Sequence, residues 1–226
     1  MDKDSTEYRK EVPVMSRERI LVVLLVILCG SLAASAVSPY DRATWFMEVA
    51  PVLIVVPILV LTYRRLPLTP LLYVLLFLHA IVLITGGAYT YARVPLGFRL
   101  EGLFHFSRNN YDRIGHFFQG LVPALLAREL LLRLGHVSSR RMASFLAICF
   151  AMAVSAWYEL IEWAAAVALG AKAEDFLGTQ GDPWDTQWDM FMCFVGSVVA
   201  MTGLTGVQDR QIEGLAPDSV SRGDKA

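Results

Sequence analysis

Six long apolar runs separated by polar links dominate the pattern of hydrophobic and polar positions along this chain. The runs cover residues 20–37, 45–63, 68–91, 114–134, 142–169 and 187–204. A helix needs about 20 predominantly apolar residues to cross roughly 30 Å of hydrocarbon, because it rises about 1.5 Å per residue. The pattern therefore predicts an all-α fold, a polytopic integral membrane helical bundle with six transmembrane helices.

The polar segments that flank and join these runs predict one domain with two tails. Residues 1–19 form an N-terminal segment of mixed charge, residues 20–205 the transmembrane domain, and residues 206–226 a flexible C-terminal tail. No repeat with a fixed period is evident. Two links, 92–113 and 170–186, are long enough to fold over a site.

Composition supports the membrane assignment and argues against a nucleic-acid partner. Of the 226 residues, 55% are hydrophobic and only 18% charged, and the mean hydropathy is +0.48. Soluble domains carry about a quarter charged residues. The net charge is −1, and no basic stripe with interleaved aromatic residues is present. Membrane lipids are therefore the expected surroundings.

The distribution of Lys and Arg predicts how the chain is oriented. With six spans, both termini lie on the same side of the membrane, and 6 of the 20 Lys and Arg residues fall on the opposite side. These are Arg42, Arg93, Arg99, Arg108, Arg113 and Lys172. Lys and Arg accumulate in cytoplasmic loops. The pattern predicts a multi-pass protein of the bacterial inner membrane with both termini in the cytoplasm and the first, third and fifth links outside.

Three segments bring acidic side chains, and in one case a histidine, into apolar helix. Their sequences are NNYDRIGHFFQG (109–120), YELIEW (158–163) and GTQGDPWDTQWD (178–189). Residues three or four apart share a helical face, and the pairs so related are Asp112 with His116, Glu159 with Glu162, and Asp185 with Asp189. The predicted topology brings all three segments to the outer side.

A divalent metal ion is the predicted partner of this acidic cluster. A charged side chain at the centre of a bilayer costs on the order of 3 kcal/mol, so Glu159 and Glu162 are expected to point into the bundle. Carboxylate and imidazole ligands suit Zn, Mn, Fe, Mg or Ca in different proportions. The predicted ligands are Asp112, His116, Glu159, Glu162, Asp185 and Asp189. Shared protons are the alternative compensation.

Several of these residues also have purely structural interpretations. Asp112 next to Arg113 is typical of an acid at a helix N-terminus, His116 alone of a hydrogen-bonded bundle histidine, and Asp185 of a helix cap. Among the other polar residues, Arg128 and Glu129 are expected to form an interfacial pair.

The three segments together resemble the YjdF-like family of uncharacterised bacterial inner-membrane proteins. The matching stretches are NNYDRIGHFFQG, YELIEWAAA and LGTQGDPWDTQWDM. The order of the acidic pairs and His116 also looks, more distantly, like VanZ-type membrane proteins, which are linked to teicoplanin tolerance and envelope functions. The VanZ-type pattern has Lys where Arg113 stands and Gln where Glu162 stands. The family resemblance implies the fold and the choice of site residues, and it brings no activity.

The leading functional hypothesis is a metal-dependent enzyme that faces the envelope and acts on a lipid-linked or amphipathic substrate. Glu159, Glu162 and Asp182 are the candidate catalytic residues, with one glutamate as general base. Gly178 and Gly181 predict a shaped loop over the site. An ion- or proton-coupled transporter and a non-catalytic accessory protein are the alternatives.

Overall fold

The computed structural model describes residues 16–169 and 180–215, and all of the regular secondary structure in these ranges is helical. The elements are α1 (Arg17–Val37), α2 (Arg42–Thr62), α3 (Pro70–Tyr89), α4 (Pro95–Phe104), α5 (Tyr111–Arg133), α6 (Arg140–Leu169), α8 (Asp185–Val199), η2 (Ala200–Leu204) and α9 (Thr205–Glu213). The predicted residues 1–15 and 216–226 of the two tails, and 170–179 of the fifth link, lie outside the described ranges.

Local residues explain where the first helices begin: α1 and α2 start three residues before their predicted spans, and α3 starts two residues after the start of its span. The Ser16 side chain accepts a hydrogen bond from the Arg19 backbone N at 3.4 Å at the start of α1. The Asp41 side chain accepts one from the Thr44 N at 2.8 Å at the start of α2. Pro70 is the first residue of α3, a position where a backbone N–H would have no acceptor within the helix. Such caps supply acceptors for otherwise unpaired N–H groups.

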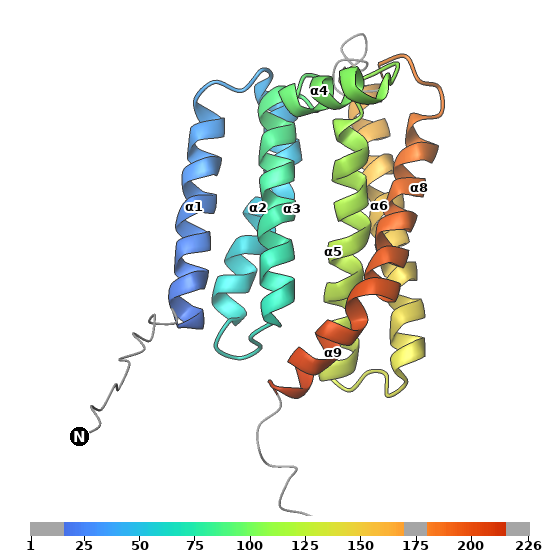
Figure 1. The fold of residues 1–226 in the computed structure, drawn as a ribbon. Coiled ribbons are helices and arrows are strands. Elements are labelled where there is room, and N and C mark those ends of the chain that lie inside the picture. The colour runs from blue at the N-terminus through green and yellow to red at the C-terminus, as the bar shows by residue number, and fades with distance from the viewer. Residues whose placement is uncertain (1–15, 170–179, 216–226) are drawn as a thin grey trace, which may run out of the picture.

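The long helices run alternately up and down in one bundle (Figure 1). Helices α1, α2 and α3 form one group and α5, α6 and α8 another, and α3 contacts α5 between them. The beginning of α1 and the whole of α9 lie at one end of the bundle. Helix α4 lies across the opposite end, where α5 and α8 begin (Figure 1). The starts of α5 and α8 are therefore neighbours, as the site prediction requires.

Among the described residues, five helical stretches are long and apolar enough to cross a membrane. They are Arg17–Val37, Arg42–Thr62, Pro70–Tyr89, Arg140–Ala168 and Asp185–Glu213. Helix α5 has 23 residues, about 34 Å at 1.5 Å per residue, but it is more polar than the others. Its charged residues are enclosed by protein, since Asp112, Arg128 and Glu129 are buried. The predicted all-α membrane bundle is confirmed, and the count of six spans depends on α5.

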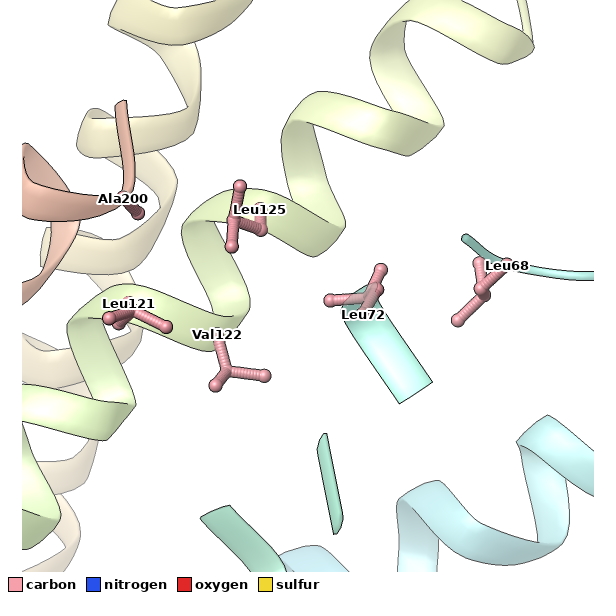
Figure 2. Close-up of a cluster of buried hydrophobic side chains, with 6 residues drawn as sticks. All are labelled: Leu68, Leu72, Leu121, Val122, Leu125 and Ala200. Atoms are coloured by element: carbon pink, nitrogen blue, oxygen red, sulfur yellow. The ribbon is translucent and has the colours of Figure 1, made fainter. Parts of the chain in front are cut away.

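A buried aliphatic cluster joins the two groups of helices near the end where α9 lies. It consists of Leu68, Leu72, Leu121, Val122, Leu125 and Ala200 (Figure 2). The cluster brings together the start of α3, the middle of α5 and η2. Because these side chains are no more than 6% exposed, α5 is packed between α3 and the last helix of the chain.

Two glycines let α5 and α8 approach until their backbones touch. A Cβ atom added to Gly120 of α5 would overlap the carbonyl group of Cys193, and one added to Gly196 of α8 would overlap the carbonyl of Phe117. Small residues permit this kind of close helix packing in membranes. Gly120 lies one helical turn from His116, so the same contact brings His116 next to α8.

Two segments predicted to be irregular are helical. Helix α4 occupies part of the predicted link 92–113, where Pro95 opens a short amphipathic helix. The C-terminal helix continues through α9 to Glu213, so the tail predicted from residue 206 begins later. Gln208 of α9 is fully buried, and its Oε1 accepts a hydrogen bond from Arg128 Nη1 at 2.8 Å. Such polar contacts hold α9 against α5, and they leave no trace in a hydropathy pattern.

Arg128 and Glu129, near the end of α5 beside α9, were predicted to be interfacial, but they are buried in the bundle. Arg128 and Glu129 are 1% and 0% exposed. Glu129 accepts hydrogen bonds from the Thr69 N at 2.9 Å, the Thr69 hydroxyl at 2.7 Å and Arg133 Nη1 at 2.9 Å. A buried carboxylate needs such partners, and here they fasten α5 to the start of α3.

Candidate metal centre

The close contact of α5 and α8 brings Asp112, His116 and Asp189 together. Each offers one ligand atom, and these atoms all lie within 4.8 Å of one another. His116 Nε2 is 3.5 Å from Asp112 Oδ1 and 3.8 Å from Asp189 Oδ2. All three residues are buried: Asp112 is 9% exposed, His116 5% and Asp189 2%. Half of the predicted ligands therefore form one compact group, built from two helices.

Gln119 is the hydrogen-bond partner of one ring nitrogen of His116. Gln119 Oε1 lies 3.0 Å from His116 Nδ1 and accepts a hydrogen bond when that nitrogen carries the proton. With the proton on Nδ1, Nε2 keeps its lone pair and points toward Asp112 and Asp189. A hydrogen bond to the non-coordinating nitrogen is the usual way in which proteins orient a metal-binding imidazole. Gln119 was not among the predicted site residues, although it is three residues after His116 and so lies on the same helical face.

Two carboxylate oxygens at the centre are buried without a hydrogen-bond partner among the described residues. They are Oε1 of Glu159 and Oδ1 of Asp189. Glu159 Oε1 lies 3.8 Å from His116 Nδ1, which brings α6 to the edge of the group. Buried polar atoms almost always have a partner. Two carboxylate oxygens without a protein partner beside an imidazole are what a cation-binding site presents.

Two other predicted site residues, Asp182 and Asp185, form ion pairs with arginines at the periphery of the centre. Asp185 forms a close ion pair with Arg108. Asp182 lies 3.5 Å from Arg108 Nη1 and 3.2 Å from Arg113 Nη2. From the sequence, both arginines were predicted only to be positive charges on the outer side. Their partners could not be assigned from the sequence, because they come from links that are far apart in the chain.

Two hydrogen bonds between Asn109 and Gln180 join the segment before α5 to the segment before α8 at this edge. The Asn109 backbone N donates to Gln180 Oε1 at 3.1 Å, and Gln180 Nε2 donates to the Asn109 carbonyl at 2.8 Å. Gln180 and Gly181 both have positive φ, of 49° and 83°, which turns the chain sharply before α8. The predicted loop residue Gly178 lies outside the described ranges, so only the second half of that loop is seen.

Glu162 lines a cavity of about 620 Å³ together with Glu48, Asp112 and His116. Glu48 of α2 accepts a hydrogen bond from the Tyr158 hydroxyl at 2.8 Å. This bond joins α2 to α6 across the cavity. The centre therefore has two sides, with Asp189 on the α8 side and Glu48 and Glu162 on the cavity side.

Fold and site together define a helical integral membrane protein with a buried Asp–His–Asp group near one end of its bundle. A family described as "Predicted membrane protein (DUF2238)" matches residues 20–210, and the chain belongs to this family. The inner membrane protein YjdF of Escherichia coli (strain K12) is 52% identical over 199 residues, which cover 88% of this chain and 92% of the relative. The predicted YjdF-like membership is confirmed, and the VanZ-type likeness stays a prediction. No solved structure matches the chain.

Proposed function

We propose that this protein is a divalent-metal-dependent enzyme of the bacterial inner membrane, with Asp112, His116 and Asp189 as its metal ligands. The observation that carries the proposal is the position of their ligand atoms, all within 4.8 Å of one another in a buried site. One imidazole and two carboxylates suit Zn, Mn or Fe. Catalytic zinc sites commonly have three protein ligands and leave a position for water or substrate.

The other acidic residues take supporting roles in this proposal. Glu159 has an unpaired oxygen 3.8 Å from His116 Nδ1 and is either a fourth ligand or the general base that takes a proton from water. Glu162 faces the cavity and is the second candidate base. Asp185 and Asp182 orient Arg108 and Arg113 at the rim, where the guanidinium groups can attract an anionic substrate.

The reaction class that fits is hydrolysis of a phosphoryl or ester bond in a lipid-linked or amphipathic substrate. A divalent metal ion supplies Lewis-acid chemistry, which polarises such an oxygen and makes water a better nucleophile. The protein contributes a buried site, an oriented imidazole and a carboxylate base. The cavity beside the centre offers a substrate a route that does not leave the membrane.

For orientation, we propose six crossings with both termini in the cytoplasm and the centre on the outer side. The start of α1 and helix α9 lie at the same end of the bundle (Figure 1), and 14 of the 20 Lys and Arg residues belong to that side in the predicted topology. A cysteine introduced at the exposed Ser38 is expected to react with an impermeant maleimide in intact cells. One at the exposed His136 is expected to react only after permeabilisation. The reverse result contradicts this orientation.

An ion- or proton-coupled carrier is the second candidate, favoured by three titratable side chains along the cavity. Glu48, Glu162 and His79 line it together, and Nε2 of His79 is buried without a hydrogen-bond partner in the described part of the chain. A carrier predicts proton or cation flux into liposomes that contain the purified protein. Flux that Glu48→Gln and Glu162→Gln abolish favours the carrier over the enzyme.

Elemental analysis of the purified protein tests the metal centre directly. We expect near-stoichiometric divalent metal in the wild type and its loss in Asp112→Asn, His116→Ala and Asp189→Asn proteins. His136→Ala is the matched control, because His136 is exposed and far along the chain from the site. A wild type that neither retains nor takes up Zn, Mn or Fe excludes the proposal. So does metal that remains bound in all three variants.

A further inference from the structure

The cavity beside the metal centre is long, apolar in its middle and polar at both ends. Helices α1, α2, α3, α5 and α6 all contribute to its wall. Its lining on α2 extends from Glu48 to Val60, and the 12-residue separation corresponds to about 18 Å along a helix axis. This length is more than half of the roughly 30 Å hydrocarbon thickness of a bilayer.

The polar groups of the cavity are distributed very unequally. Asp112, His116, Glu48, Tyr158 and Glu162 gather at the end where the metal centre lies. Aliphatic and aromatic side chains dominate the wall beyond them, and they include Leu25, Val52, Val56, Leu76, Phe77 and Leu126.

Between the two ends the described lining is mainly apolar, and His79 of α3 is its one titratable imidazole there. Its ring lies against that of Phe118, with centroids 6.1 Å apart and an interplanar angle of 29°. The opposite end has Glu18 and Arg64. The stretch between the two polar ends therefore offers apolar contact, and cavities with such walls hold hydrocarbon more readily than water.

The cavity also opens toward the surroundings of the bundle. Val22 of α1 and Val60 of α2 line it, and they are 59% and 55% exposed. Both residues lie in the half of the bundle away from the metal centre. In a membrane this opening meets acyl chains, so a hydrocarbon tail can enter sideways without passing through water.

We propose that this cavity binds the hydrocarbon chain of a single-chain amphiphile whose phosphate headgroup reaches Asp112 and His116. The inference rests on the proposed function, because the metal centre is what makes an anionic headgroup favourable next to carboxylates. A volume of about 620 Å³ is in the range of sites that enclose one small ligand. It suits one chain rather than the two of a phospholipid. The chain lies along the bundle, as lipid tails do in the outer leaflet.

Photolabelling of the intact protein in phosphatidylcholine nanodiscs tests chain binding. The probe is hexadecyl phosphate with a diazirine near the end of its chain, and mass spectrometry identifies the labelled peptides. Labelling is expected on the cavity wall of α1 and α3. Val56→Phe narrows the cavity and is expected to reduce labelling by about 5- to 150-fold, since overpacking costs roughly 1–3 kcal/mol and 1.4 kcal/mol corresponds to tenfold.

Matched controls use neighbouring residues that face outward. Ile54 is 60% exposed and is on the same helix as Val56, so Ile54→Phe should leave labelling unchanged. Leu25→Phe and Val26→Phe form a second pair on α1, where Val26 is 65% exposed. The second pair keeps the test decisive if the Val56→Phe protein does not fold. Equal labelling of the cavity-facing and outward-facing variants overturns the proposal.

Competition by unlabelled compounds tests the position of the headgroup. Hexadecyl phosphate should compete roughly tenfold or more better than hexadecanol, because charge-assisted contacts are worth about 1.5–3 kcal/mol. Equal competition overturns the headgroup assignment. The metal content of each protein separates this inference from the proposed enzyme. If the purified protein contains no metal and Leu25→Phe still abolishes labelling, chain binding is supported and the proposed enzyme is excluded.

Discussion

Replacing Gly120 with alanine is expected to separate the two helices that carry the metal ligands. The added Cβ would overlap the carbonyl oxygen, carbonyl carbon and Cα of Cys193. All three are backbone atoms, so no rotation of a side chain relieves the overlap, and α5 and α8 must move apart. Asp112 and His116 move with α5, while Asp189 moves with α8.

The expected loss of stability in Gly120→Ala is the difference between two opposing effects. Overpacking of a close contact costs roughly 1–3 kcal/mol, and a backbone obstacle puts Gly120→Ala at the upper end of this range. Alanine gains up to about 1 kcal/mol over glycine in helix propensity. The net loss of about 2 kcal/mol lowers the unfolding midpoint by about 4–8 °C for a chain of this size. Ligand distances tolerate only about 0.2 Å, and disturbed support of a metal site typically costs roughly 10–100-fold in metal affinity.

Thermal unfolding followed by circular dichroism and zinc titration by calorimetry measure the two effects in the same preparation. Gly30→Ala is the matched control, because Gly30 lies within α1 and no atom approaches the added Cβ within 4 Å. We expect Gly30→Ala to unfold at or slightly above the wild-type midpoint and to bind zinc normally. A Gly120→Ala protein that behaves like Gly30→Ala would refute the idea that this contact sets the geometry of the site.

Three further predictions follow from the described contacts. Gln119→Ala should weaken zinc binding by roughly 10–100-fold without loss of fold, because it removes the acceptor at His116 Nδ1; unchanged affinity in the titration contradicts the assigned orientation of the ring. Glu129→Ala should cost about 3–5 kcal/mol in denaturant unfolding, because it removes the buried carboxylate that the buried Thr69 hydroxyl and the partly buried Arg133 share as a partner, and a midpoint close to the wild type contradicts this. Asp41→Ala should cost about 1 kcal/mol through loss of the α2 cap, whereas Asp41→Asn, which keeps an acceptor, should cost less in the same assay.

Hydropathy predicted the fold class well because a bilayer imposes a simple requirement on length and composition. Five of the six predicted spans correspond to helices that meet this requirement. Helix α5 was also predicted, although its composition is more polar, because its apolar residues still outnumber the charged ones in the run 114–134. The end of α9 was missed because buried hydrogen bonds of Gln208, rather than apolar character, hold that helix in place.

Helical spacing predicted which residues share a face, and so it pointed to Asp112 with His116 and to Asp189. It could not tell that Asp185 pairs with Arg108 while Asp189 lies next to His116. Both aspartates satisfy the same spacing rule and share one face of α8, so the difference depends on the position of α8 along the axis of α5. The two glycine contacts of Gly120 and Gly196 help to fix that position.

The sequence by itself determined that this protein is a helical membrane bundle with acidic residues on three of its helices, because both properties depend on local runs and periodicity. Only the tertiary structure decided that Asp112, His116 and Asp189 form one compact group and that an apolar cavity lies beside them. These properties depend on distances between helices. Such distances are set by where small residues let backbones touch, and no single segment of the chain contains that information.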